Sequence, residues 1–230
     1  MYDLIIQNAN IVDGTLKKPF TADIEILDDI IVKRGKNLGK AKKYYDAEGL
    51  TLCPGIIDIH THYDAQLTWD LTASPSLELG VTTAVIGNCG FTIAPCRKQD
   101  RDLNMKNLTK VEGMPYQTLK KGIDWSYKTY SDYLKLLEAK NLSLNICSYI
   151  GHSALRIWCM GEDAMKRKAT EEEILEMENV VKNAMESGAI GFSTSTFEGH
   201  NGANGVPMPS RFATKDEIKR LVLAMACQGR

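Results

Sequence analysis

The sequence predicts an α/β protein in which a small β-sheet precedes a larger region of parallel strands and helices. Residues 1–54 hold only short β-rich runs separated by turn residues, whereas residues 55–230 alternate apolar runs with helical segments. Near-continuous apolar strands are typical of a parallel sheet that is covered on both faces. We therefore predict two domains, with the boundary between residues 54 and 55.

The N-terminal region is expected to be a small antiparallel sheet. Turn signals at Asp13-Gly14 and Asp28-Asp29 separate its β-rich segments, and Pro54-Gly55 closes the last of them. The predicted strands cover residues 3–12, 22–27, 30–33 and 42–53. A sheet this small is expected to keep an exposed edge.

From residue 55 onward, strands are expected to alternate with helices about four times. The expected strands are the apolar runs IIDIH, TTAVIGNCG, SLNICSYIGHS and GAIGFSTS. Helices are predicted over residues 132–140, 174–187 and 218–228. Ser131 precedes the first helix, and capping boxes that begin at Thr170 and Thr214 precede the other two. Residues 97–128 show no clear period and are expected to form a long loop.

Charge and composition exclude several classes of protein. The 28 basic residues are balanced by 29 acidic residues, which argues against nucleic-acid binding through bulk charge. No apolar run approaches the ~20 residues of a membrane span, and the N-terminus lacks the features of a signal peptide. The six cysteines contain no CxxC pair and are expected to be reduced. A cytoplasmic protein that binds neither nucleic acid nor membrane is therefore expected.

The segment PGIIDIHTH carries the clearest chemical signal. His60 and His62 lie at the carboxyl end of a predicted strand, and the strand period of two residues directs both imidazoles to one face. Two imidazoles with little polar company suit a transition metal such as Zn²⁺. The alternative is a pair of histidines with local hydrogen bonds, and HxH after an apolar strand favours the metal.

Cys89 lies at the corresponding end of the next predicted strand. Gly87 and Gly90 flank it, so we expect a tight turn from which a thiolate could reach a metal held by the two histidines. Position alone leaves this equal to a buried structural thiol, the usual state of a cysteine. Cys96 is the weaker candidate, because it lies seven residues further along, in the following loop.

The segment GHSALR follows the third predicted strand. His152, Ser153 and Arg156 are candidates for a substrate pocket, because active sites of parallel barrels collect at the carboxyl ends of the strands. Arg156 could bind a substrate carboxylate, but pairing at the surface is the favoured interpretation. For His152, a pocket role and a local capping role remain equal.

Four polar residues near the other strand ends are weaker candidates. Ser195 and Thr196 could donate hydrogen bonds to an acyl group or form a local turn. His200 lies in a loop rich in glycine and asparagine and is expected to face solvent. Asp64 could orient a ligand or substrate from behind.

Four segments together resemble one protein family. In chain order they are PGIIDIHTHYD, GVTTAVIGNCGFTIAP, YIGHSALR and SGAIGFSTS. They are similar to the D-aminoacylase (N-acyl-D-amino-acid deacylase) branch of the amidohydrolase superfamily. HxH alone indicates the superfamily, whereas GNCG with GHSxLR and GAIGxST is more specific. The resemblance spans nearly the whole chain.

The resemblance implies a fold, a metal and a reaction. The family combines a (β/α)8 barrel with a β-sandwich built from both chain ends, so residues 1–54 and 55–230 are expected to form part of each. Cys89 is then a zinc ligand beside His60 and His62, for one or two Zn²⁺ ions. The fourth strand contains no lysine, which argues against a site of the hydantoinase type. The implied substrate is a small molecule, an N-acyl-D-amino acid, whose linear amide bond is hydrolysed by metal-activated water.

The resemblance also implies that this chain holds only part of the active site. A (β/α)8 barrel takes ~250 residues, and about 180 follow Pro54. The family's catalytic aspartate comes from a later strand, so no catalytic residue is expected here and the general base is expected beyond Arg230. We therefore expect the amino-terminal half of an enzyme, a fragment that is inactive alone and able to self-associate through exposed barrel edges.

Alternatives from other classes remain. The chain could serve a different amidohydrolase activity, on a cyclic amide or a dipeptide. It could be a non-catalytic zinc-binding half-barrel that pairs with a second chain. A plain α/β protein without metal is the third alternative, and it predicts no bound zinc.

Overall fold

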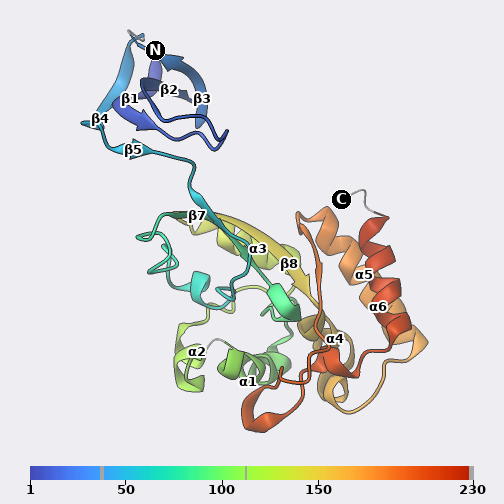
Figure 1. Cartoon of the computed structure of the whole chain (residues 1–230). Coiled ribbons are helices and arrows are strands. Elements are labelled where there is room, and N and C mark those ends of the chain that lie inside the picture. Colours follow the sequence, from blue (N-terminus) through green and yellow to red (C-terminus); the bar gives the residue numbers. More distant parts are fainter. Residues whose placement is uncertain (37–38, 112, 228–230) are drawn as a thin grey trace. The chain divides into compact units, whose positions relative to one another are not determined.

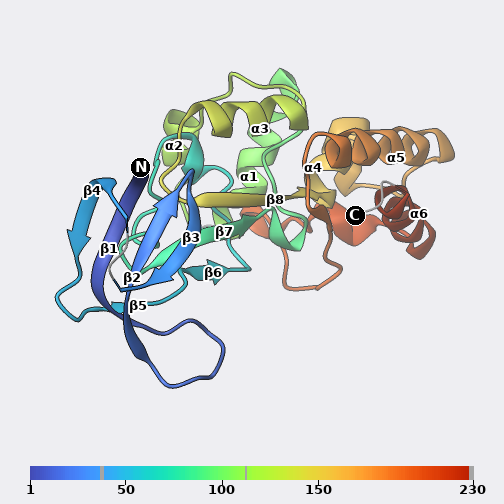
Figure 2. The same ribbon diagram turned by 90° about the horizontal axis from the view of Figure 1, so that it is seen from above.

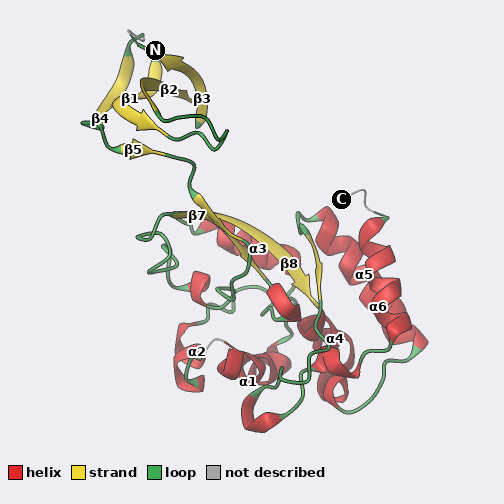
Figure 3. Ribbon diagram, viewed as in Figure 1, coloured by secondary structure: helices red, strands yellow, loops and turns green. Residues whose placement is uncertain are grey.

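The computed structural model describes residues 1–36, 39–111 and 113–227, and we discuss only these. The chain divides into two compact units, Met1–Gly55 and Ile56–Arg230. The first is an all-β unit, and the second alternates strands with helices (Figure 1, Figure 3). The predicted α/β class, with an N-terminal sheet and a separate parallel sheet, is confirmed.

The first unit is a mixed sheet, so the expectation of an antiparallel one was wrong in part. Its strands are β1 (Tyr2–Ile11), β2 (Phe20–Leu27), β3 (Ile30–Gly35), β4 (Ala41–Asp46) and β5 (Thr51–Leu52). β2 runs antiparallel to β1 and to β3, whereas β4 and β5 run parallel to β1. Glu48 and Gly49 both take positive φ, 49° and 83°, and divide the predicted strand 42–53 into two.

The second unit is built on a parallel sheet of four strands. They are β6 (Ile56–Asp58), β7 (Val81–Ile86), β8 (Asn145–Gly151) and β9 (Gly191–Ser193), and they lie in the order of the chain. All three ladders are parallel, so the carboxyl ends of the strands gather at one edge of the sheet (Figure 2). Ala84, Ile86 and Ile150 are buried in its core.

The helices are not distributed one to a strand. They are α1 (Arg101–Val111), α2 (Tyr116–Gly122), α3 (Tyr130–Ala139), α4 (His152–Met160), α5 (Glu171–Glu186) and α6 (Lys215–Ala226). Only a short 3₁₀ turn, Gln66–Thr68, lies between β6 and β7, whereas three helices follow β7. Helices α5 and α6 pack side by side (Figure 1). None of the helices in the described ranges is long and apolar enough to cross a membrane.

Of the predicted helix starts, that of α5 is confirmed and that of α3 differs. The Thr170 capping box is present, because the Thr170 side chain accepts from the Glu173 N–H and the Glu173 carboxylate accepts from the Thr170 N–H. The same reciprocal pair forms at Thr129 and Asp132, so α3 begins two residues earlier than Ser131 indicated. Helix α6 ends at Ala226, and the predicted end at residue 228 lies outside the described residues.

Residues 97–128 contain two helices, α1 and α2, and not the expected long loop. Met105, Leu108 and Leu119 anchor them in the core. The buried positions of α1 also include Asn104 and Asn107, whose exposed fractions are only 2% and 5%. Because polar residues occupy the buried face, the apolar period that would identify a helix in the sequence is missing.

Candidate metal centre

His60 and His62 lie just beyond β6, which ends at Asp58. The pleat of a strand therefore does not direct their rings, contrary to the expectation. The loop is held instead by Thr61, whose N–H and hydroxyl both donate to the carbonyl oxygen of Val85, at 3.0 and 2.9 Å. The Asn88 side-chain amide donates to the carbonyl oxygen of Thr61 at 3.2 Å.

The structure brings the three candidate ligands together. The Sγ atom of Cys89 lies 3.3 Å from Nε2 of His60, and the rings of His60 and His62 are 5.4 Å apart between centroids. One ligand atom from each of the three residues lies within 4.8 Å of the other two. No other cluster of three or more His, Cys, Asp or Glu side chains suited to a metal occurs in the described part of the chain.

The turn that carries Cys89 depends on glycine. Gly87, Cys89 and Gly90 all have positive φ, at 78°, 55° and 80°. A Cβ atom on Gly87 would stand 2.5 Å from the backbone oxygen of Tyr149, closer than any real contact. The motif GNCG thus allows the backbone to reverse tightly against β8 while it presents the thiol of Cys89.

The chemistry of this cluster fits a transition metal. Burial, followed by the charge of His60, lowers the pKa of His62 to about 4, so its ring is neutral, the form that binds metals. Nδ1 of His62 is buried and has no hydrogen-bond partner among the described residues. Burial raises the pKa of the Cys89 thiol, and a cation is what would favour its thiolate. Two imidazoles and a thiol are donors that Zn²⁺ accepts.

Asp64 supports this site from behind. Its carboxylate accepts from the Gly87 N–H at 3.0 Å, and burial raises its pKa to about 7. Asp64 is thus bonded to the Cys89 turn, a role consistent with the predicted orienting one. The Asp64 backbone oxygen accepts from the Tyr133 hydroxyl at 2.9 Å, which ties the loop after β6 to α3.

His200 lies beside the cluster and is half-buried, so the expectation that it faces solvent was wrong in part. Its ring packs against Phe91, 5.0 Å between centroids, and its Nδ1 shares a hydrogen bond of 2.8 Å with the Ser195 hydroxyl. Together with His62 and Lys110, these rings line a shallow hollow. Ser195 therefore reaches the neighbourhood of the site through His200, whereas Thr196 is exposed.

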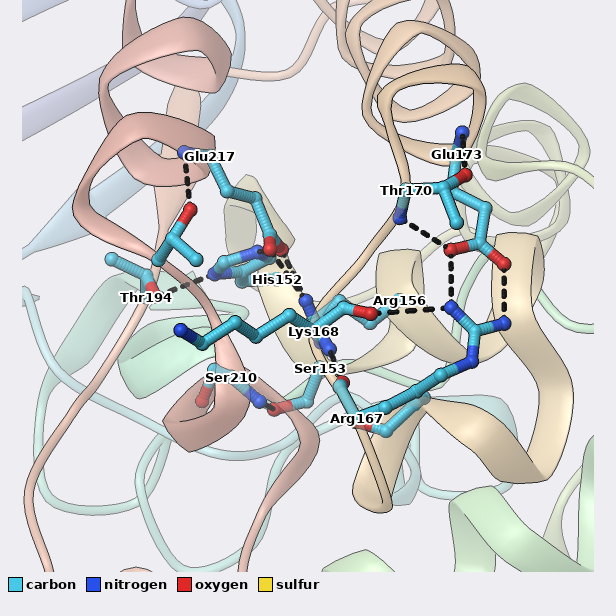
Figure 4. Close-up of polar contacts among 12 residues, drawn as sticks. His152, Ser153, Arg156, Arg167, Lys168, Thr170, Glu173, Thr194, Ser210 and Glu217 are labelled. Atoms are coloured by element: carbon cyan, nitrogen blue, oxygen red, sulfur yellow. Dashed lines mark hydrogen bonds and ion pairs between the residues drawn. The ribbon is translucent and has the colours of Figure 1, made fainter.

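His152, Ser153 and Arg156 lie at the start of α4 in a buried polar network (Figure 4). Arg156 is fully buried, so its expected surface pairing was wrong, and its Nη1 donates to both Glu217 oxygens at 2.5 and 2.6 Å. Nε2 of His152 lies 2.9 Å from Oε1 of Glu217, and Nδ1 lies 2.7 Å from the Thr194 hydroxyl. The structure places these side chains inside the protein, where none of them lines the hollow beside His62.

Glu217, which pairs with both His152 and Arg156, was not predicted from the sequence. Thr214 does cap α6, since its hydroxyl accepts from the Glu217 N–H at 3.0 Å. The Glu217 carboxylate, which should complete the capping box, points instead to His152 and Arg156. One signal was available: Glu217, Leu221 and Ala224 are spaced as one helix face, and that face is buried.

In this network Glu217 is ionised and His152 is neutral. Burial opposes ionisation of Glu217, but hydrogen bonds from His152 and Arg156, together with the Arg156 charge, hold its pKa below the usual range. Burial lowers the pKa of His152 in spite of Glu217, so His152 is neutral. A carboxylate only accepts, hence Nε2 of His152 carries the proton and Nδ1 accepts from the Thr194 hydroxyl.

This network predicts acid sensitivity. As pH falls below 6.5, the unfolded chain protonates His152 and the folded chain does not, so His152 should contribute a fall in the free energy of unfolding of up to about 1.4 kcal/mol per pH unit. Below pH 4.5, protonation of Glu217 in the unfolded chain adds to the loss. Urea unfolding followed by circular dichroism between pH 7.5 and 5 measures the slope. His152→Gln should remove the His152 part of this slope and leave the parts due to His62 and Asp64, and an identical slope in that variant would contradict the assignment.

The fold and the candidate site together define a class of protein. A parallel sheet with two histidines after its first strand and a cysteine after its second is a parallel α/β fold with a candidate metal site at the carboxyl ends of its strands, where active sites of barrel-type enzymes lie. The sequence profile of the amidohydrolase family matches residues 43–229, and the chain belongs to this family.

Three similar proteins indicate the branch of the amidohydrolase family that this chain resembles. The D-aminoacylase of Alcaligenes xylosoxydans xylosoxydans is 32% identical over 230 residues, which are 99% of this chain and 43% of that protein. A D-aminoacylase structure reported for its binuclear metal centre superposes with a TM-score of 0.79 at 30% identity, over 100% of this chain and 44% of that one. The structure of N-acyl-D-glutamate deacylase of Bordetella bronchiseptica, complexed with zinc and a phosphonate inhibitor, superposes with a TM-score of 0.72 at 26% identity. The match covers 100% of this chain and 44% of that one. The resemblance to the D-aminoacylase branch is confirmed, and the chain spans less than half the length of these relatives.

Proposed function

We propose that these residues form the metal-binding portion of a hydrolase that removes the acyl group from N-acyl-D-amino acids. The observation that carries the proposal is the convergence of His60, His62 and Cys89 at the carboxyl edge of the parallel sheet. The similarity to D-aminoacylase and to N-acyl-D-glutamate deacylase supports the substrate class. Residues 1–54 are proposed as part of a β-sandwich, and residues 55–230 as the amino-terminal half of a barrel.

The proposed cofactor is Zn²⁺, as one or two ions held by His60, His62 and Cys89. When bound, such a cation polarises the amide carbonyl and lowers the pKa of a water molecule toward ~7. The residues of this chain would hold the cation and orient its ligands. The Gly87–Gly90 turn presents the Cys89 sulfur, and Asp64 fastens that turn by accepting from the Gly87 N–H.

The general base is proposed to lie outside these residues. Within the described ranges, the two carboxylates nearest in sequence to the histidines are engaged with backbone N–H groups. Asp58 accepts from His60 N–H at 3.1 Å, and Asp64 accepts from Gly87 N–H at 3.0 Å. The 230 residues alone are therefore proposed to bind metal without turning over N-acyl-D-amino acids, and the catalytic carboxylate completes the site in the whole enzyme.

Zinc binding tests the proposal directly. The purified chain should bind Zn²⁺ in competition with a chromophoric chelator. Cys89→Ser or His60→Ala should weaken the zinc affinity at least about tenfold, because loss of a metal ligand should weaken binding at least as much as loss of a residue that only orients a ligand. Cys53→Ser is the matched control, since Cys53 is exposed and lies outside the cluster. Equal zinc affinity in Cys89→Ser and Cys53→Ser would contradict the proposed site.

A further inference from the structure

The last residue of β9 holds the turn that carries Cys89. The Gly90 N–H donates to the Ser193 hydroxyl at 3.0 Å, and that hydroxyl in turn donates to the carbonyl oxygen of Gly87. A single side chain therefore bridges the two glycines on either side of Asn88 and Cys89. The contact spans more than 100 residues of sequence, since Gly90 and Ser193 are 103 positions apart.

The turn needs such support because its backbone is strained. Cys89 has φ of 55°, a left-handed conformation that is unfavourable for a residue with a side chain. On its other side the turn is pressed against β8. A Cβ atom on Gly151 would lie 2.8 Å from the Gly90 oxygen, so the two backbones leave no room for one. The turn is thus confined by β8 and fastened by β9.

The end of β9 is itself anchored in the protein interior. The residue after Ser193 is Thr194, whose hydroxyl donates to Nδ1 of His152 at 2.7 Å. His152 is fully buried and is held on its far side by Glu217 (Figure 4). Neighbouring residues of an extended segment point to opposite sides, so the segment binds the interior through Thr194 and the Cys89 turn through Ser193.

From this geometry we infer that Ser193 is a positioning residue for Cys89. Its hydroxyl closes the turn from Gly87 to Gly90, and the closed turn sets the direction of the sulfur toward His60 and His62. The inference rests on the proposed metal centre, and assigns to Ser193 the role of keeping a strained residue ready to bind the cation. Ser193 itself is not a ligand.

The test uses cobalt(II) as the metal and light absorption as the readout. A thiolate bound to Co²⁺ gives a sulfur-to-metal charge-transfer band in the near ultraviolet, and the band reports the Cys89–metal bond and not the overall fold. In Ser193→Ala this band should weaken, and the Co²⁺ and Zn²⁺ affinities should fall about tenfold. Ser193→Thr keeps a hydroxyl and should restore both.

Ser148→Ala is the matched control. Ser148 is a buried serine of the same parallel sheet, and its hydroxyl accepts from the Tyr130 hydroxyl at 2.9 Å and donates to the Tyr149 carbonyl oxygen at 3.3 Å, not to a residue of the Cys89 turn. It should lower stability and leave the cobalt band unchanged. Thr194→Val is a second variant in case Ser193→Ala does not fold: it frees the end of β9 from His152 and should weaken the band in the same direction.

The outcomes separate the two proposals. If the parent chain gives no band, or if Cys89→Ser retains it, the proposed metal centre is wrong and the inference about Ser193 fails with it. If Cys89→Ser abolishes the band while folded Ser193→Ala and Thr194→Val keep full intensity and affinity, the metal centre stands and the positioning role is overturned. Equal loss in Ser193→Ala and Ser148→Ala would also overturn it, because the effect would then be general destabilisation.

Discussion

Glu217→Gln is expected to lower the free energy of unfolding by about 3–5 kcal/mol, because it leaves a buried guanidinium without its counter-charge. Arg156 and Glu217 are both fully buried, and Glu217 is the acidic partner of Arg156 within the described residues. The remaining contacts of the guanidinium are the carbonyl oxygens of Ala164 and Arg167, which cannot neutralise it. The substitution preserves volume, so the loss reports the charge.

Urea unfolding followed by circular dichroism measures this loss. Glu162→Gln is the matched control, because Glu162 pairs with Lys166 at the surface and should leave the unfolding midpoint unchanged. Adding Arg156→Met to Glu217→Gln removes the orphaned charge and should recover much of the stability. If Glu217→Gln unfolds at the same urea concentration as Glu162→Gln, the buried pair does not stabilise the fold as inferred.

Gly87→Ala is expected to cost about 2–4 kcal/mol of folding free energy and to impair metal binding as well. Two effects combine: φ of 78° disfavours any side chain, and the new Cβ would stand 2.5 Å from the Tyr149 backbone oxygen. The Tyr149 oxygen is a backbone atom and cannot swing aside as the end of a flexible side chain could, so the turn must move. Because Cys89 follows two residues later, its sulfur moves with the turn.

The control for this prediction separates strain from collision. Gly205 has nearly the same φ, 76°, in the same compact unit, and nothing lies within 4 Å of a Cβ added there. Gly205→Ala should therefore show the smaller loss, from backbone strain alone, and an unchanged zinc affinity. The measurements are urea unfolding and zinc competition on both variants, and equal losses would show that the contact with Tyr149 is unimportant.

Local signals in this sequence predicted local structure well. The Thr170 capping box starts a helix, and the glycines around Cys89 form a tight turn, because both features depend on residues within three or four positions. The prediction failed for α1, where buried Asn104 and Asn107 hide the apolar period. It failed also for the direction of β4, since strand pairing depends on contacts far along the chain.

The candidate metal cluster was predictable for a simple reason. Parallel strands end at one edge of a sheet, so residues just beyond β6 and β7 are brought together whatever the details of the loops. His60, His62 and Cys89 meet there even though the histidines lie past the last strand residue. The strand period does not direct the two imidazoles, because β6 ends before them, and the parallel topology alone brings the three residues together.

By itself, the sequence determined the starts of α5 and α6, the glycine turn, the class of fold and the ligand types that gather at the sheet edge. Only the tertiary structure decided which distant groups pair: Glu217 with Arg156, 61 positions away, and Ser193 with Gly87, 106 positions away. A carboxylate at the third residue of a helix can complete a cap or turn inward, with the same local sequence. The choice depends on the buried cation that the packing of α4 against its neighbours places beside it, because an unpaired charge in the interior is costly.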